Sequence, residues 1–337
     1  MTETAWQVDP DQAVACLDLL RQSRRICMPT HQNVDADGFG SPLAIMHALK
    51  QFEVESFVLV SDGKLADSLR FLPGSSSAIS YGRSELPDYD LLCLVDCSDK
   101  RRLGDFFTDD PSRVDGDPPI VNIDHHITND HFGTVNLVEP LAASTAEIVT
   151  DLLDIWGVEK TVPIAQCLLA GIYGDTLGLR TEATTSRTMR MAADLVDAGA
   201  NPSSITDALF RLKPASTVCL WRHALDNVAW TGKLIWTEIS RSMLADCSAD
   251  PSEAEGLVNF LAGTHGSRAA AILHENSEGW RVSLRSMTAD VDVAVISAEF
   301  GGGGHPRAAG CQVNGGEDER THFVETVAAR IERNRSP

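Results

Sequence analysis

No apolar stretch in this 337-residue sequence reaches the roughly 18 residues that a membrane-spanning helix needs. The N-terminus is acidic and lacks the charged-then-apolar pattern of a secretion signal. The eight cysteines include no CxxC pair; Cys16, Cys27, Cys93 and Cys167 lie in apolar segments, where a thiol is typically a small core residue. These absences lead us to expect a soluble cytoplasmic protein in a reducing compartment, without membrane contact.

Positive charge is also scarce. The formal net charge is −20, and only six residues are lysine. An acidic surface repels a long polyphosphate backbone, which argues against binding of long duplex nucleic acid. A small anionic substrate remains compatible with this charge, because bound metal ions reverse the local potential. Whether the acid excess reflects a high-salt habitat is left open by the composition.

The length predicts two domains, and an apolar fraction of 43% allows a sizeable core. We find neither low-complexity segments nor internal repeats. Apolar strand patterns alternate with helical ones in the first part, which predicts an α/β fold with a doubly wound, mainly parallel sheet. A smaller α/β domain is expected to follow, with the active site in the cleft between the two. The expected boundaries are 1–195 for the first domain, 196–230 for a helical linker and 231–337 for the second domain.

The expected elements follow from hydrophobic periodicity and from Gly, Pro and capping residues. Strands are predicted over 25–30, 54–60, 91–95, 120–123, 234–239, 269–273 and 280–284. Helices are predicted over 9–24, 38–52, 65–72, 143–156, 162–179, 185–211, 214–230, 291–300 and 321–333.

Several apolar elements end in Asp or His. The clearest is Val121–Ile123, which runs directly into Asp124, His125 and His126. In open α/β sheets, ligands bind outside the carboxyl ends of the strands, so such side chains are expected to converge there. A pool of carboxylates and imidazoles favours a divalent metal ion. The other candidates at such ends are His31, Asp35, Asp37, Asp96 and Asp175.

Each candidate also has a purely structural interpretation. Asp35 and Asp37 could be turn or helix-cap residues, and Asp96 could cap the following helix. Asp175 could be a buried carboxylate that accepts from a backbone amide. The consecutive His125 and His126 have few structural uses after a buried strand. Taken together, the structural interpretation needs four independent coincidences at equivalent positions.

A glycine run, Gly301–Gly304, precedes His305 near the C-terminus. Successive glycines let the backbone approach a ligand or present N–H groups to an anion, although such a run can also be a flexible loop. The alternating segment upstream places Ser283 and Arg285 on one strand face. Arg285 could bind a phosphate with two hydrogen bonds, or form a surface salt bridge.

These motifs together resemble the DHH–DHHA1 phosphoesterase superfamily over nearly the whole chain. The first motif is similar to His31–Gly38, the second to Val95–Asp99, and the namesake triplet to Asp124–His126. Gly174–Thr176 resembles the fourth motif, although members often carry Thr in place of Gly174. Gly302–His305 is similar to the DHHA1 signature. The match is closest to the type that combines oligoribonuclease activity with 3′-phosphoadenosine 5′-phosphate (pAp) phosphatase activity, the nanoRNase type.

The resemblance implies two divalent cations, with Mn²⁺ as the first candidate and Mg²⁺ or Co²⁺ as alternatives. One ion would be held by His31, Asp35 and Asp96. The other would be held by Asp37, Asp96, His125 and Asp175, with Asp96 shared. His126 would contact the scissile phosphate and Asp124 would orient the histidines. The predicted substrate-binding residues are His126, Ser283, Arg285, Gly303, Gly304 and His305.

The expected function is therefore hydrolysis of very short oligoribonucleotides to mononucleotides, with 3′-phosphatase action on pAp as a second activity. The alternatives are a phosphodiesterase for linear or cyclic dinucleotides, an inorganic pyrophosphatase, a long-strand exonuclease and a nucleotide-binding regulator without activity. A pyrophosphatase would lack the glycine–histidine signature, and a long-strand exonuclease would carry a basic channel. Dinucleotides and pAp are the expected partners, and a homodimer is left open.

Overall fold

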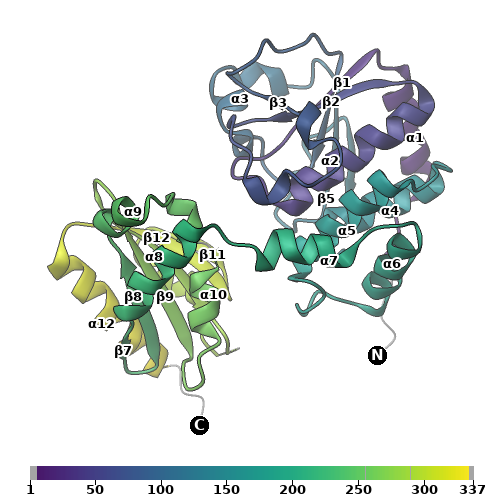
Figure 1. The fold of residues 1–337 in the computed structure, drawn as a ribbon. Coiled ribbons are helices and arrows are strands. Elements are labelled where there is room, and N and C mark those ends of the chain that lie inside the picture. The colour runs from purple at the N-terminus through teal and green to yellow at the C-terminus, as the bar shows by residue number, and fades with distance from the viewer. Residues whose placement is uncertain (1–5, 255, 289, 334–337) are drawn as a thin grey trace. The chain divides into compact units, whose positions relative to one another are not determined.

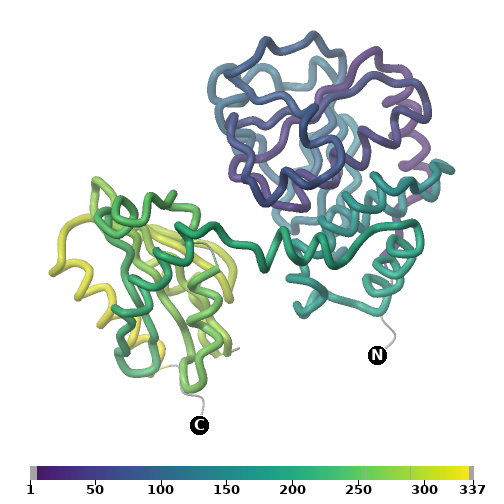
Figure 2. The backbone as a smooth tube through the Cα atoms, viewed as in Figure 1, coloured from purple at the N-terminus to yellow at the C-terminus, as the bar shows by residue number. Residues whose placement is uncertain are grey.

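The computed structural model describes residues 6–254, 256–288 and 290–333. The chain divides into two compact units, 1–212 and 213–337. Figures 1 and 2 colour the first unit from purple to teal and the second from green to yellow. The division lies within the segment 196–230 that the sequence assigns to a linker, and the helices of that segment are shared between the units. The outermost parts of the predicted domain ranges, 1–5 and 334–337, lie outside the described residues.

Unit 1 contains a six-stranded sheet in the order β3-β2-β1-β4-β5-β6, and every strand pair in it is parallel. The strands are β1 (Arg25–Pro29), β2 (Glu55–Val60), β3 (Ile79–Ser80), β4 (Leu91–Val95), β5 (Ile120–Asp124) and β6 (Val135–Val138). The helices are α1 (Pro10–Gln22), α2 (Ala36–Leu49), α3 (Asp105–Thr108), α4 (Thr145–Ile155), α5 (Val162–Thr176), α6 (Ser186–Asp197) and α7 (Pro202–Thr206). The predicted doubly wound parallel sheet is confirmed.

Both faces of this sheet are buried, which explains why β4 is a continuous apolar run rather than an alternating one. Every residue of β5 is also buried, including the polar Asn122 and Asp124. Met28, Cys93 and Val121 pack on one face with residues of α1, α2, α4 and α5. Leu92 and Leu94 point to the opposite face, where they pack with α3 and the 3₁₀ turns around it. The sheet is therefore the middle layer of unit 1.

Unit 2 contains a mixed six-stranded sheet in the order β11-β12-β10-β9-β8-β7. Its strands are β7 (Ala229–Thr231), β8 (Leu234–Ile239), β9 (Ala269–Glu275), β10 (Gly279–Ser286), β11 (Gly303–His305) and β12 (Ala308–Asn314). Its helices are α8 (Ala215–Asp226), α9 (Arg241–Cys247), α10 (Leu257–Ala262), α11 (Val293–Ala298) and α12 (Glu317–Arg333). β8 and β9 are parallel, and the other described pairs are antiparallel. Helices α11 and α12 pack on one face, and α8, α9 and α10 pack on the other.

Some sequence predictions are wrong in detail. The helix expected over 65–72 is only the 3₁₀ turn Asp67–Leu69, because the turn at Pro73–Gly74 follows at once. The helix expected over 185–211 is split into α6 and α7 by Gly199, whose φ of +101° ends a helix. The elements β3, β6, β7, β11, β12, α3, α9 and α10 were not predicted, because short or half-exposed elements give weak periodicity.

The four cysteines predicted to be core residues are buried free thiols, and so are Cys97 and Cys311. Cys219 and Cys247 form a disulfide that joins α8 to the last residue of α9. Their separation of 28 residues gave no sign of pairing in the sequence. Within the described ranges, no helix is both long and apolar enough to cross a bilayer.

Gly40 on α2 generates the first testable prediction. A Cβ at this position would lie 2.6 Å from the main-chain oxygen of Cys167 on α5, and a backbone atom cannot move aside cheaply. Gly40→Ala should therefore lower the free energy of unfolding by about 1–3 kcal/mol, as measured by urea denaturation. In the control Gly263→Ala the added Cβ comes no closer than 3.5 Å to a neighbour. Equal loss of stability in both variants would contradict the prediction.

Candidate metal centre

The candidate site lies at the carboxyl ends of the central strands. The strand order of unit 1 reverses between the neighbours β1 and β4, and such a reversal opens a crevice for ligands in α/β sheets. His31 follows β1 by two residues, Asp96 follows β4 directly, and His125 follows β5 directly. Asp37 comes from the first turn of α2, and Asp175 from the last turn of α5.

The six predicted metal ligands lie close together. His31 Nε2 lies 3.5 Å from Asp96 Oδ2 and 3.8 Å from Asp35 Oδ1. His125 Nε2 lies 3.2 Å from Asp175 Oδ2 and 3.6 Å from Asp96 Oδ1. Among the described residues, three sets of donor atoms at this site could each hold a metal ion, with the atoms of a set within 4.8 Å of one another. These sets are His31, Asp35 and Asp96; Asp37, His125 and Asp175; and Asp96, His125 and His126.

Both histidines are oriented by main-chain carbonyls. His31 Nδ1 lies 2.9 Å from the carbonyl of Gln32, and His125 Nδ1 lies 3.2 Å from that of Ala142. A carbonyl accepts but cannot donate, which favours a proton on Nδ1 and the lone pair on Nε2 in each neutral ring. Arg102 Nη2 also lies 3.4 Å from His31 Nδ1. His31 Nε2 is buried and has no hydrogen-bond partner among the described residues. A buried acceptor left in this way, facing carboxylates, fits a metal ligand.

Asp35 caps a helix, as its structural interpretation predicts, and it also belongs to a set of possible metal ligands. Its Oδ1 accepts from the N–H groups of Asp37 and Gly38, so it is the N-cap of α2. Its side chain is 57% exposed. Capping leaves the second carboxylate oxygen for another partner, so the two roles are compatible.

Asp37 is fully buried, and the N-terminus of α4 holds it. Its carboxylate accepts from the backbone N–H groups of Thr145 at 2.6 Å and Ala146 at 2.9 Å, and from the hydroxyl of Ser41 at 2.8 Å. The free N–H groups of a helix N-terminus favour a negative charge. The Thr145 hydroxyl also donates to Asp96 Oδ1 at 2.9 Å, so one residue positions both carboxylates. Sequence analysis missed Thr145, although Ser144–Thr145 is a plain helix-start signal.

Burial and the neighbouring charges together shift the pKa values of the buried carboxylates. Burial raises the pKa of Asp37, and the charges of Asp175 and Asp96 raise it further. Burial likewise raises the pKa of Asp175 to about 6, against the opposing effect of His125. Burial would also raise that of Asp96, but the interaction with His31 and the charges of His125 and His126 hold its pKa well below the usual range.

The same carboxylates shift the pKa values of the two imidazoles, because they favour the protonated, charged form of each ring. Burial alone would lower the pKa of His31, but the carboxylates of Asp35 and Asp96 raise it to about 10. Burial opposes the charged form of His125 in the same way, and the carboxylates of Asp175 and Asp96 raise its pKa to about 10. The carboxylates therefore stabilise positive charge in the site. Protons on His31 and His125 supply this charge when no metal ion is bound. Divalent cations suit such a set of oxygen and nitrogen donors.

His126 differs from the other two histidines. Its Nδ1 lies 2.7 Å from Asp124 Oδ1, and Asp124 is fully buried. The second oxygen of Asp124 accepts from the Asn129 amide at 2.7 Å, and the same amide donates to Asn122 Oδ1 at 2.7 Å. Asn122 in turn donates to the carbonyl of Cys97 at 3.0 Å. Hydrogen bonds thus fix the orientation of His126. Sequence reasoning gave no role to the two asparagines, because their partners are set by the fold.

Two glycines make room for the site. A Cβ on Gly38 would lie 2.4 Å from His31 Nε2, and a Cβ on Gly171 would lie 2.6 Å from Asp37 Oδ1. Any larger residue at these positions would displace a candidate ligand. The requirement for glycine here is spatial, since neither residue has a positive φ.

The predicted substrate residues of unit 2 occupy neighbouring rows of its sheet. Ser283 and Gly303 both pair with Gly310, which lies between them on β12. Arg285 and His305 both pair with Ala308, two residues away, so the two rows share one face. Arg285 Nε donates to Asn259 Oδ1 at 3.0 Å. The tertiary structure therefore brings Ser283, Arg285, Gly303 and His305 together.

Gly304 lies in the row between these two, opposite Ala309, which packs in the core on the other face. Its φ is +143°, and a Cβ would lie 2.5 Å from the carbonyl oxygen of Ala308. Glycine is therefore needed at this position for the backbone conformation.

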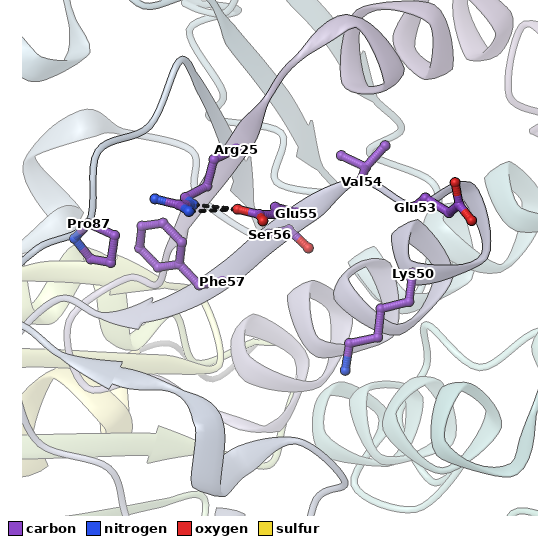
Figure 3. A pocket seen from close by; sticks show the side chains of 8 residues that line it. All are labelled: Arg25, Lys50, Glu53, Val54, Glu55, Ser56, Phe57 and Pro87. Carbon is purple, nitrogen blue, oxygen red and sulfur yellow. Dashed lines mark hydrogen bonds and ion pairs between the residues drawn. The ribbon is translucent and has the colours of Figure 1, made fainter.

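A cavity of about 570 Å³ lies elsewhere in unit 1. Figure 3 shows its lining, which includes the ion pair between Arg25 and Glu55 at the amino ends of β1 and β2. Lys50, Phe57 and Pro87 complete its walls together with three further residues. These are the strand ends opposite to those that carry His31 and Asp96, so the cavity is separate from the candidate metal centre.

Comparisons with known proteins find relatives over most of the chain. The family model described as "DHH family, N-terminal domain" matches residues 25–172, and the one described as "DHHA1 domain" matches residues 238–333. The chain is 33% identical over 316 residues to the bifunctional oligoribonuclease and PAP phosphatase of Thermus thermophilus, covering 92% of this chain and 91% of the relative. It is 25% identical to the Bacillus subtilis protein of the same name, over 86% and 89% of the two chains.

A solved structure shares the fold. The crystal structure of an exopolyphosphatase-related protein from Bacteroides fragilis has a TM-score of 0.88 to this chain, at 22% identity, and covers 99% of each chain. The similarity extends over both units described above.

The raised imidazole pKa values generate a prediction about pH. Without metal, the folded protein keeps protons on His31 and His125 that the unfolded chain releases near its ordinary value of 6.5. Their contribution to stability is thus complete below that pH and is lost as the pH rises toward about 10. A divalent cation needs the neutral rings, so the increase in melting temperature on adding Mn²⁺ should grow between about pH 6.5 and 9.

Thermal unfolding with EDTA or with Mn²⁺, under anaerobic conditions, measures this difference. His125→Gln should reduce the pH dependence, whereas His322→Gln, at an exposed position on α12, should leave it unchanged. A stabilisation by Mn²⁺ that stays constant with pH would contradict the prediction.

Proposed function

Because this chain belongs to the DHH family, we propose that it is a metal-dependent phosphoesterase that hydrolyses very short oligoribonucleotides to mononucleotides and also removes the 3′-phosphate of pAp. The observation that carries this proposal is the convergence of six carboxylate and imidazole side chains around Asp96 at the carboxyl ends of the strands. One relative from Thermus thermophilus and one from Bacillus subtilis support the choice of substrate, because both are named as oligoribonuclease and PAP phosphatase.

In this proposal, His31, Asp35 and Asp96 hold one divalent cation, and Asp37, Asp96, His125 and Asp175 hold the other. Mn²⁺ is our first choice, with Mg²⁺ and Co²⁺ as alternatives. When bound, such a pair of ions activates the attacking water and stabilises the charge on the attacking and leaving oxygens of an in-line displacement. Asp96 has an oxygen directed to each set, at 3.5 Å from His31 and 3.6 Å from His125, which suits a shared ligand.

His126 is proposed to bind the scissile phosphate. Its Nδ1 is engaged by Asp124, so Nε2 is the nitrogen available to the substrate. Asp124 holds the orientation of the ring, so that Nε2 can contact a phosphate oxygen. Asp124 therefore acts as a positioning residue, and His126 as the group that contacts the substrate.

Unit 2 is proposed to bind the rest of the substrate. Arg285 and His305 supply donors for a phosphate from one row of the sheet, and Ser283 and Gly303 supply a hydroxyl and an open backbone from the next. A binding surface of this limited size favours substrates of a few nucleotides. Linear or cyclic dinucleotides and pyrophosphate are the alternative substrates that the same metal centre could hydrolyse.

A substrate panel tests the proposal. The purified protein with Mn²⁺ should release mononucleotides from dinucleotides and inorganic phosphate from pAp, much faster than it cleaves long oligonucleotides, cyclic dinucleotides or pyrophosphate. Asp96→Asn should lower kcat at least about 1000-fold because both ligand sets lose their shared carboxylate. Asp99→Asn, at a half-buried carboxylate that pairs with Arg101 instead of the candidate ligands, is the control. Rapid cleavage of pyrophosphate or cyclic dinucleotides with no release from dinucleotides would refute the proposed substrate.

The hydrogen bonds that link His126 to Asp124 and Asp124 to Asn129 lead to a further prediction. Asn129→Ala removes the donor to Asp124 and should lower kcat about 10- to 100-fold with a smaller change in KM. Asn129→Asp keeps the shape but sets two carboxylates against each other, so its kcat should be lower still. The control Asn136→Ala removes bonds only to Gly133 of a local turn. Steady-state kinetics in which Asn129→Asp is as active as wild type would rule out this positioning role.

A further inference from the structure

The disulfide of unit 2 has a histidine beside it. Among the described residues, the sulfur atoms of Cys219 and Cys247 and a ring nitrogen of His223 all lie within 4.8 Å of one another. These three residues form a further set of possible metal ligands, and the set shares no member with the candidate metal centre. A disulfide needs no imidazole, and neither the motifs nor the proposed function give His223 a role.

Two helices hold these three side chains together. Cys219 and His223 lie four residues apart on α8, so they share one face of that helix. Zinc-binding helices use the same spacing for two of their ligands. Cys247 is the last residue of α9, and its Cα lies 5.6 Å from that of Cys219. Leu220 of α8 and Leu244 of α9 also pack in one apolar cluster, so the disulfide is not the only link between the two helices.

The site is partly shielded from water. Cys247 is buried, and Cys219 and His223 are half-buried. Arg222 Nη2 donates to His223 Nε2 at 2.9 Å, and since a guanidinium cannot accept, Nε2 carries a lone pair in this contact. A metal ion on either ring nitrogen requires Arg222 to move aside, because Nε2 then either binds the ion or carries the proton. Arg222 is exposed, so this movement costs little.

The donor atoms of this set select a different class of cation from those of the candidate metal centre. Thiolate sulfur and imidazole nitrogen favour Zn²⁺ over Mn²⁺ and Mg²⁺. The candidate metal centre offers mainly carboxylate oxygens, which suit Mn²⁺ and Mg²⁺. Two cysteines and one histidine leave the fourth position of a tetrahedral zinc ion for water.

We propose that the reduced form of Cys219 and Cys247 binds Zn²⁺ together with His223, so that the metal ion links α8 to α9 in place of the disulfide. Reduction by a small dithiol breaks the bond between the sulfur atoms, yields two thiols and oxidises the dithiol to a disulfide. The two thiol protons pass to the solvent as the sulfur atoms bind the ion. This inference does not rest on the proposed function.

The reverse change is also defined chemically. A small oxidised disulfide accepts the two electrons as the bond between Cys219 and Cys247 forms. Its own sulfur–sulfur bond breaks, it takes up two protons to become two thiols, and the metal ion leaves. The zinc-bound form is therefore expected only under reducing conditions.

Cobalt(II) is the probe for this site, because thiolate ligands give it a near-ultraviolet charge-transfer band that carboxylate and imidazole ligands do not. The full chain is reduced with a phosphine, freed of metal by chelation and titrated with Co²⁺ in the absence of air. The band should appear, should be abolished by Zn²⁺ and should persist in excess Mn²⁺. It should be absent from the oxidised protein.

Substitutions assign the band to these residues. His223→Gln keeps both thiols and should weaken Co²⁺ binding, measured by this band, at least about tenfold. Cys247→Ser should abolish the band. The matched controls are His265→Gln, at an exposed position of the same unit, and Cys311→Ser, since Cys311 is 7% exposed and Cys247 8%. Both controls should keep the band.

A reduced wild-type protein without the band, or a band that His223→Gln and Cys247→Ser leave unchanged, would overturn the proposal. If circular dichroism shows that Cys247→Ser does not fold, the His223→Gln result still decides, because this change replaces only a half-buried ring. Hydrolysis of the substrate panel with Mn²⁺ is measured on the same preparations. Failure of that hydrolysis would refute the proposed function and leave the zinc site unaffected.

Discussion

The repulsion among Asp35, Asp37, Asp96 and Asp175 is the constraint on which the rest of unit 1 depends. Four carboxylates with two imidazoles at the end of a buried sheet are stable only if positive charge accompanies them. The pKa values of His31 and His125, raised to about 10, express this demand as proton uptake. A cation that replaces those protons satisfies the same demand. The repulsion that lowers the stability of the site in the absence of positive charge therefore also favours the binding of metal ions.

The fold meets this cost largely with backbone groups, and one basic side chain, Arg102, lies with its Nη2 3.4 Å from His31 Nδ1. The N-terminus of α4 donates two N–H groups to Asp37, and main-chain carbonyls orient His31 and His125. Arginine or lysine in these places would compete with a metal ion, whereas backbone dipoles stabilise the ligands and leave them available. The close approach of α2 and α5 brings Asp37 and Asp175 into the same set, and it is possible because Gly40 and Gly171 carry no side chain.

In unit 2, the register of three strands brings the candidate substrate-binding residues together. Because β12 lies between β10 and β11, residues separated by about twenty positions in sequence become neighbours in one row. The small residues of that row and the arginines beside it, Arg281 and Arg285, lie on one face of the sheet. The glycine run, which composition alone leaves as either a loop or a ligand-binding segment, is partly a strand: Gly303 and Gly304 pair with Gly310 and Ala309.

The sequence by itself determined the parallel sheet of unit 1 and the identity of the metal-ligand candidates, because long apolar runs and the polar residues that end them are local signals. It also singled out Ser283 and Arg285, since alternation along a strand is local. Only the tertiary structure decided that Thr145 and Asn129 support the centre, that Cys219 pairs with Cys247, and that His223 lies beside this pair. Those relations depend on which elements become neighbours, and that is set by packing across the whole domain rather than by any one segment.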